Sequence, residues 1–301
     1  MKHLLKLSDL TTEEILSILD LADQLKYERK NGIPHPHLAG KSIGLIFEKS
    51  STRTRVSFET GIYQLGGQPI FLSSRDLQIG RGEPVQDTAR VLSRYLDGIM
   101  IRTFEQKEVE DLATYGSIPI INGLTDYCHP CQVLADLMTI REKYATLEDI
   151  KLAYIGDGNN MTNSLIVGGL KTGMKVSVAC PEGYMPDADI LAWAKENPNF
   201  EITTDPKVAV AGADVVYTDT WASMGQESEK EARIKAFQGY QVNDELMALA
   251  NEKAMVQHCL PAYRGQEITD EVFEAHADEL FDEAENRLHA QKAVMVLLMK
   301  D

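Results

Sequence analysis

Short apolar runs alternate with segments of helical periodicity along the whole chain, and this alternation constrains the fold more than any other feature. The runs have the length of strands and form two series, at Ser42–Phe47, Pro69–Leu72, Gly98–Ile101 and Ile118–Ile121, and then at Lys151–Ile155, Lys175–Ala179, Val215–Tyr217 and Ala254–His258. Strands that alternate with helices are typical of parallel sheets covered by helices. We therefore expect an α/β fold.

The two series of strands predict two α/β domains, which the length of 301 residues allows. The stretch Cys131–Tyr144 has the pattern of one helix, and Ala145–Asp149 has the pattern of a connection to the second series. A terminal helix over Glu285–Met299 is compatible with packing on either domain. The dense acidic residues of 270–285 indicate a solvated helix face.

The charge of the chain limits its partners. The formal net charge is -16, with 44% hydrophobic and 25% charged residues. A large basic face for nucleic acid is not expected, so an anionic substrate must meet a local cluster of positive charge.

The N-terminus and the cysteines bear on the compartment. Met1-Lys2-His3 leads directly into an amphipathic pattern, and the apolar run Ala293–Met299 is too short to span a bilayer. Four cysteines in a chain of this length do not indicate a disulfide framework. We expect a cytoplasmic protein with no membrane partner.

The segment Ser51-Thr52-Arg53-Thr54-Arg55 follows the strand expected at Ser42–Phe47 and precedes a helical pattern that ends near Gly66-Gly67. The first N–H groups of a helix lack partners within the helix, and the helix dipole favours negative charge there. Hydroxyl groups and guanidinium groups at that position predict a site for a phosphate dianion. The alternative is a serine N-cap with surface arginines.

The segment Cys128-His129-Pro130-Cys131 is open to three interpretations. A C-x-x-C pair at a helix start suits a redox couple or half of a zinc site, although no second metal-ligand pair completes the site. In the third interpretation His129 and Gln132, three positions apart, point into one cleft.

Three further segments lie at the ends of expected strands. Gly156-Asp157-Gly158-Asn159-Asn160 is similar to a dinucleotide-binding turn, but Met161 stands where the third glycine belongs. The competing hypothesis is that the two asparagine amides bind an amino-acid head group. Asp219-Thr220-Trp221-Ala222-Ser223-Met224-Gly225 offers a carboxylate and hydroxyls for the same purpose, and His258-Cys259-Leu260-Pro261 ends the last strand.

Taken together and in this order, these segments closely resemble the ornithine carbamoyltransferase family, within the aspartate/ornithine carbamoyltransferase superfamily. The resemblance also includes Arg102-Thr103 and Arg287, covers essentially the whole chain, and separates from the aspartate branch at Ser223-Met224-Gly225. It implies two domains with a C-terminal helix that crosses back to the first: 1–135 with 286–301 for carbamoyl phosphate, and 136–285 for ornithine.

The resemblance also implies the site residues. Those for carbamoyl phosphate are Ser51, Thr52, Arg53, Thr54, Gln78, Arg102, His129, Gln132, Cys259, Leu260 and Arg287. Those for ornithine are Asn160, Asp219, Ser223 and Met224. Among these, Arg102, His129, Cys259 and Arg287 are implied to be catalytic.

The activity implied is transfer of a carbamoyl group to the δ-amine of L-ornithine, which yields L-citrulline, in arginine biosynthesis. The family also implies a homotrimer or a multiple of trimers, and the reaction needs no metal or organic cofactor. Three alternatives remain open at this point: a nicotinamide-dependent dehydrogenase, a non-catalytic binding protein, and a carbamoyltransferase that acts on putrescine or N-acetylornithine.

Overall fold

The computed structural model describes residues 1–75, 77–78, 82–222 and 227–300. The chain forms two compact units, Met1–Met138 with Asn286–Asp301, and Thr139–Glu285. Each unit is built on its own parallel sheet.

The first unit contains a four-stranded sheet in the order β2-β1-β3-β4. Its strands are β1 (Ser42–Phe47), β2 (Gln68–Ser73), β3 (Gly98–Arg102) and β4 (Ile120–Leu124), and each neighbouring pair is parallel. In the central pair Phe47 stands beside Arg102, so the loops after β1 and β3 leave the same edge of the sheet.

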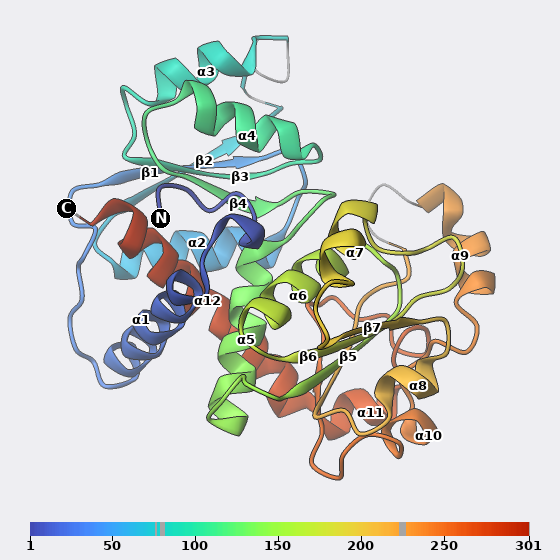
Figure 1. The fold of residues 1–301 in the computed structure, drawn as a ribbon. Coiled ribbons are helices and arrows are strands. Elements are labelled where there is room, and N and C mark those ends of the chain that lie inside the picture. The colour runs from blue at the N-terminus through green and yellow to red at the C-terminus, as the bar shows by residue number, and fades with distance from the viewer. Residues whose placement is uncertain (76, 79–81, 223–226, 301) are drawn as a thin grey trace. The chain divides into compact units, whose positions relative to one another are not determined.

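Helices cover both faces of this sheet (Figure 1). On one face lie α3 (Val85–Leu92) and α4 (Gln106–Tyr115), and on the other lies α2 (Thr52–Gln64). The 3₁₀-helix η1 (Leu7–Asp9) precedes α1 (Thr12–Lys30), which begins with a capping box between Thr11 and Glu14. The buried residues between the sheet and α3–α4 include Ile46, Ile99, Ile101, Val109 and Leu112.

The second unit contains a five-stranded parallel sheet in the order β7-β6-β5-β8-β9. Its strands are β5 (Lys151–Ile155), β6 (Lys175–Ala179), β7 (Phe200–Thr203), β8 (Val215–Thr218) and β9 (Met255–Gln257). Because β5 and β8 are parallel neighbours, the loops after them also leave one edge.

The helices of the second unit cover its sheet as those of the first do (Figure 1). They are α6 (Asn160–Lys171), α7 (Ala188–Ala194), α8 (Pro206–Val210), the 3₁₀-helix η3 (Glu227–Glu229), α9 (Lys230–Ala236), α10 (Asp244–Met247) and α11 (Asp270–Ala275). In this unit α6 and α7 lie on one face of the sheet and α8 on the other.

Two helices each contain residues of both units. The helix α5 (Pro130–Tyr144) begins in the first unit and ends in the second, and α12 (Ala277–Met299) begins in the second and ends in the first. The predicted fold class, with its returning C-terminal helix, is thus confirmed.

The structure differs from the sequence-based expectation in three places. The edge strand β7 was not predicted from its short pattern, and α12 begins at Ala277 rather than near Glu285. Not all acidic residues of 270–285 are solvated, because Glu283 is fully buried and accepts a hydrogen bond of 2.9 Å from the N–H of His258.

Within the described part of the chain, no helix has both the length and the apolar character needed to cross a bilayer.

Candidate active site

The first candidate site lies at the edge where β1, β3 and β4 of the first unit end. Ser51 is the N-cap of α2, Arg102 is the last residue of β3, and His129 directly precedes α5. Because parallel strands end at the same edge, the topology gathers residues that are distant in the sequence.

The hydroxyl group of Thr54 is the centre of this cluster. Thr54 is fully buried, and its Oγ1 accepts hydrogen bonds from Arg102 Nη1 at 3.4 Å and from Arg287 Nη2 at 3.0 Å. Ser51 Oγ lies 3.1 Å from the same oxygen and accepts the N–H of Thr54 at 3.2 Å. Two buried guanidinium groups therefore converge on the first turn of α2, where an anion is favoured.

The electrostatics of His129 follow from this cluster. Burial, and then the positive charges of Arg287 and Arg102, lower the pKa of His129 well below its ordinary value. The imidazole is neutral at neutral pH, so it offers one N–H donor and one acceptor nitrogen.

The other residues predicted for this site differ in how deeply they are buried. Gln132 is buried, and its Nε2 donates to Asp136 Oδ1 at 2.8 Å. Arg53 is half-buried and Thr52 is exposed on the first turn of α2. Gln78 is exposed in a bend after β2.

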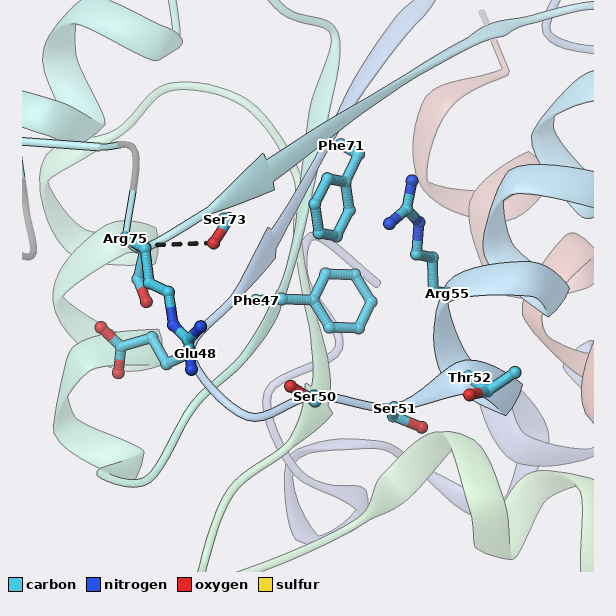
Figure 2. A pocket seen from close by; sticks show the side chains of 10 residues that line it. Phe47, Glu48, Ser50, Ser51, Thr52, Arg55, Phe71, Ser73 and Arg75 are labelled. Carbon is cyan, nitrogen blue, oxygen red and sulfur yellow. Dashed lines mark hydrogen bonds between the residues drawn. The ribbon is translucent and has the colours of Figure 1, made fainter.

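A cavity of about 250 Å³ lies beside the N-terminus of α2 (Figure 2). Its lining includes Ser51 and Thr52, together with Phe47, Glu48, Ser50, Arg55, Phe71, Ser73, Ser74 and Arg75. The second arginine of the motif, Arg55, is directed to this cavity. Its guanidinium stacks 3.7 Å from the Phe71 ring centroid, and its Nε donates to Glu59 at 2.9 Å. Arg55 is thus an exposed residue of the cavity wall.

The cysteine pair lies in the buried interior of the first unit. Cys128 and Cys131 are buried as free thiols, and burial raises the pKa of each to about 12. Cys128 Sγ lies 3.2 Å from Asn122 Nδ2, and Cys131 Sγ donates to the Asn122 carbonyl at 3.4 Å. Burial therefore disfavours the thiolate that redox catalysis requires, and both side chains are core residues.

The second candidate site lies in the second unit, at the edge where β5 and β8 end. Asp219 follows β8 and is buried. Its Oδ2 accepts a hydrogen bond of 2.8 Å from Asn159 Nδ2, and its Oδ1 accepts the N–H of Thr220 at 2.7 Å. Asn159 is also the N-cap of α6, where its Oδ1 accepts from the N–H of Met161 at 2.9 Å.

The structure gives the two asparagines of this segment different positions. Asn160, the predicted binding residue, is half-buried at the first position of α6. Asn159 is the residue that orients Asp219. The sequence indicated the position of Asn159 only by placing it directly before the helix, where an asparagine N-cap is favoured.

The glycine turn after β5 does not leave room for a dinucleotide. A Cβ at Gly158 would lie 2.2 Å from Met185 C and 2.6 Å from the Tyr184 carbonyl oxygen. In a dinucleotide site the corresponding space lets the backbone approach the pyrophosphate. Here protein backbone occupies it, so the glycine serves internal packing.

Cys259 and Leu260 follow β9, and Cys259 contacts the same carboxylate. Cys259 Sγ donates to Asp219 Oδ1 at 3.1 Å. His258 Nδ1 accepts the N–H of Leu260 at 2.9 Å, so the proton is on Nε2, which donates to the buried Glu267 at 3.0 Å.

The ligand atoms of Asp219, His258 and Cys259 lie within 4.8 Å of one another, which raises the question of a cation. Both ring nitrogens of His258 already have protein partners, and the Cys259 thiol already donates to Asp219. The group is therefore arranged as a hydrogen-bond network, because a metal ligand must offer a lone pair.

Two predicted residues, Ser223 and Met224, lie outside the described residues. A further residue, Arg233 on α9, was not predicted at all. It is buried, and its Nη1 donates to Asp157 at 2.8 Å and to the Trp221 carbonyl at 3.0 Å. No pattern in the sequence connects it with these loops.

The sequence matches two domain families. Residues 2–142 match the family described as aspartate/ornithine carbamoyltransferase, carbamoyl-P binding domain. Residues 148–298 match the one described as aspartate/ornithine carbamoyltransferase, Asp/Orn binding domain. The first match ends near the C-terminus of α5, and the second begins after that helix.

The chain is also similar to whole proteins over nearly its full length. An ornithine carbamoyltransferase from Oceanobacillus iheyensis is 57% identical over 305 residues, which cover 100% of this chain and 95% of that protein. Among solved structures, an ornithine carbamoyltransferase from Pyrococcus furiosus has a TM-score of 0.95 and 52% identity, covering 99% of this chain and 97% of the other. An anabolic ornithine carbamoyltransferase from Campylobacter jejuni has a TM-score of 0.93 and 43% identity, with 99% of each chain covered.

Proposed function

The chain belongs to the aspartate/ornithine carbamoyltransferase family, and from this membership we propose which of its residues carry out the reaction. The reaction is transfer of the carbamoyl group from carbamoyl phosphate to the δ-amine of L-ornithine, which yields L-citrulline and phosphate.

Each substrate is assigned to one domain. Residues 1–135 with 286–301 form the carbamoyl-phosphate domain, and residues 136–285 form the ornithine domain. The observation that carries this assignment is the convergence of Arg102 and Arg287 on Thr54 at the N-terminus of α2. Such a cluster suits a phosphate dianion, whereas Asp219 in the second unit suits a cation.

Carbamoyl phosphate is bound through its two ends. Ser51, Thr52, Arg53, Thr54 and Arg102 hold the phosphate, with Gln78 as a further contact. His129, Gln132 and Arg287 surround the carbamoyl group, and the support for His129 is its burial beside both arginines. A neutral imidazole donates a hydrogen bond to the carbamoyl oxygen without adding a third positive charge.

Ornithine is bound through its α-amino and carboxylate groups. Asp219 accepts from the α-ammonium, and Asn160, Ser223 and Met224 complete the contacts to the head group. Cys259 and Leu260 lie beside the δ-nitrogen and the carbamoyl group. The support for this arrangement is the network in which Asn159 and Cys259 both donate to the Asp219 carboxylate and so fix its orientation.

The chemistry requires a neutral amine and a stabilised oxyanion. The δ-amine has a pKa near that of lysine, about 10.4, and must lose its proton before it attacks the carbamoyl carbon. The tetrahedral oxyanion then accepts hydrogen bonds from His129, Arg102 and Thr54, and one such donor is typically worth about 3–4 kcal/mol.

The leaving group completes the transfer. Arginine side chains stabilise the departing phosphate, and that phosphate can itself accept the proton released by the amine. The remaining rate acceleration comes from holding the two substrates in line. With these roles for the phosphate and the side chains, the proposed reaction needs no metal or organic cofactor.

We further propose a cytoplasmic homotrimer, or a multiple of trimers, that serves arginine biosynthesis. Sedimentation equilibrium tests the assembly, because the chain mass is 33.5 kDa and a trimer has three times that mass. A monomeric mass at micromolar concentration would contradict the proposal.

Reciprocal variants test the assignment of the substrates. Arg53→Ala should weaken carbamoyl phosphate binding and lower kcat/KM by a factor that corresponds to about 3 kcal/mol. Asp219→Asn should raise the KM for ornithine severely. Titration calorimetry with carbamoyl phosphate and a citrulline assay measure the two effects.

Each variant serves as the control for the other. Asp219→Asn should bind carbamoyl phosphate almost as the wild type does. The assignment is wrong if Arg53→Ala retains carbamoyl phosphate binding and turnover within about a factor of ten.

A further inference from the structure

Arg233 is a buried charge near the amino-acid site, and the proposed reaction does not use it. It lies on the short helix α9 with only a small exposed fraction. Its Nη1 donates to Asp157 Oδ2 at 2.8 Å and to the Trp221 carbonyl at 3.0 Å. Its Nε donates to Glu229 Oε2 at 3.0 Å, within the same helical segment.

The two acceptors of Nη1 belong to different loops. Asp157 lies in the loop after β5, and Trp221 lies in the loop after β8, the neighbouring strand. The same two loops carry Asn159 and Asp219, which are joined by their own hydrogen bond. Arg233 therefore links the two segments that carry Asn159 and Asp219.

Aromatic packing supports the same link. The ring of Trp221 stacks on Phe237, the C-cap residue of α9, with 5.8 Å between the ring centroids. The guanidinium of Arg233 lies 5.0 Å from the ring centroid of Tyr184, which in turn packs on Phe237 at 5.0 Å. Arg233 is thus held in one position by both polar and aromatic neighbours.

Burial disfavours the charged form of Asp157, and the adjacent Arg233 favours it. Burial raises the pKa of Asp157 to about 6, although the adjacent Arg233 acts to lower it. A buried ion pair of this kind is a weak source of stability, and its best-attested use is to specify one arrangement of the groups that it joins.

We propose that Arg233 is a positioning residue for the amino-acid site, which fixes the loop after β5 against the loop after β8 and so holds Asp219 in the orientation that binds the α-ammonium. This inference rests on the proposed role of Asp219. It requires no contact between Arg233 and either substrate.

The test uses the full-length enzyme and a probe of the head group alone. L-Norvaline has the α-amino and carboxylate groups of ornithine but no δ-nitrogen, so its binding is independent of the amine chemistry. Its inhibition constant against ornithine is measured for the wild type, Arg233→Met, Arg233→Lys, Asp157→Asn and Asp219→Asn. Arg264→Met is the control, since Arg264 in the same unit makes two ion pairs at the surface, with Asp270 and Glu274.

The expected result is a selective loss of head-group binding. Arg233→Met should raise the inhibition constant of norvaline and the KM for ornithine by about tenfold or more, with the KM for carbamoyl phosphate and kcat at saturating ornithine within about threefold of the wild type. Arg233→Lys should recover part of the loss, because its ammonium keeps the charge beside Asp157 but has no counterpart of the Nε that donates to Glu229. Arg264→Met should behave as the wild type.

A double-variant cycle separates positioning from general destabilisation. If Arg233 acts through Asp157, adding Arg233→Met to Asp157→Asn should cost much less than Arg233→Met alone, with a coupling of about fivefold or more in norvaline binding. Should Arg233→Met fail to fold, Arg233→Lys and Asp157→Asn carry the test, and both are expected to raise the norvaline constant.

Two outcomes overturn different statements. Normal norvaline binding by the folded Arg233 variants, together with a lowered melting temperature, would overturn this inference and leave a purely structural arginine. Normal norvaline binding by Asp219→Asn would overturn the proposed role of Asp219 itself, whatever the Arg233 variants do.

Discussion

At the scale of single residues, the site depends on groups whose protonation is set by their neighbours. His129 is the clearest case, because burial and two guanidinium groups all disfavour the imidazolium form. A histidine in this state does not act as an acid near neutral pH. Its contribution is one neutral N–H donor in a fixed position.

We predict that the pH dependence of the reaction reflects the amine and not His129. The value of kcat/KM for ornithine should rise from pH 6 toward alkaline pH, with no inflection near 6.5, because His129 stays neutral throughout this range. His129→Ala should lower kcat by about 10²–10³-fold, the usual effect of removing one oxyanion donor. Steady-state kinetics of both proteins across the pH range measure this.

His129→Gln provides the matched control for that prediction. Its amide retains a neutral N–H donor and has no group that titrates in this range. It should keep more activity than the alanine variant and the same shape of pH profile. An inflection near pH 6.5 that is present in the wild type and missing in His129→Gln would contradict the prediction.

The cysteine pair gives a second prediction at this scale. Because the pKa of Cys128 and of Cys131 is raised to about 12, neither side chain is a thiolate under working conditions. The double variant Cys128→Ser, Cys131→Ser should keep most of the transferase activity, and the wild type should not reduce insulin disulfides. Disulfide reductase activity that disappears in the double variant would show the opposite.

At the scale of elements, α2 and α12 are joined at both ends of α2. At its first turn Thr54 accepts from Arg287, and at its last residue Gln64 Oε1 accepts from Lys292 Nζ at 3.0 Å. Between them Gly61 allows close packing, since a Cβ there would lie 3.1 Å from Lys292 Cγ. The position of Arg287 therefore depends on how residues 286–299 of α12 pack on α2.

Lys292 is an unusual component of this contact because it is fully buried. Its Nζ lies 2.7 Å from His35 Nε2, and His35 Nδ1 donates to the Ile33 carbonyl at 2.8 Å. With the His35 proton on Nδ1, its Nε2 accepts from the lysine. Burial, and then the nearby Arg29, lower the pKa of Lys292 to about 8.

We predict that Lys292 makes the stability of the protein depend on pH in the alkaline range. The pKa of a lysine in the unfolded chain is 10.5, so the stability linked to the depressed pKa is complete above that value and is lost as the pH falls through about 8. Relative to Lys292→Met, the unfolding free energy of the wild type should therefore increase between pH 8 and pH 10, by an amount on the order of 2 kcal/mol. Urea unfolding at several pH values measures the difference.

Lys235→Met is the control for this experiment, because Lys235 is exposed on α9. Its difference from the wild type should not change with pH over the same range. An equally flat difference for Lys292→Met would show that the buried ammonium carries no such penalty.

At the scale of the whole molecule, the two units carry opposite charges at their candidate sites. The first unit directs arginine side chains to the start of α2, and the second directs the Asp219 carboxylate to the ends of β5 and β8. This division suits one dianionic substrate and one substrate with an ammonium group. It also predicts how strictly the acceptor is selected.

We predict that ornithine is favoured over putrescine by at least ~10²-fold in kcat/KM, because the polar groups proposed to bind the carboxylate are left without a partner when putrescine binds. N-Acetylornithine should also be a poor acceptor, since acetylation removes the ammonium that Asp219 is proposed to bind. A citrulline-type colorimetric assay with a panel of amines measures the order. Comparable turnover of putrescine and ornithine by the wild type would refute the acceptor site but not carbamoyl transfer.

The sequence by itself was sufficient for the architecture. Eight of the nine described strands begin at their expected starts or within two residues of them, as Ser42–Phe47 and Lys151–Ile155 do, because apolar runs bounded by turns carry a local signal. The position of Ser51 and Asn159 before helices was likewise readable, since an N-cap is a local arrangement of side chain and backbone. The edge strand β7, which is short and only partly buried, lacks that signal.

Only the tertiary structure decided which polar groups meet. Thr54 and Arg287 are 233 positions apart, and Asp157 and Arg233 are 76 apart, so no periodicity or motif spacing connects them. The neutral state of His129 and the use of Gly158 for internal packing were equally unreadable from the chain. The reason is physical: helix and strand patterns arise from neighbours in sequence, whereas burial, pKa values and hydrogen-bond partners arise from neighbours in space.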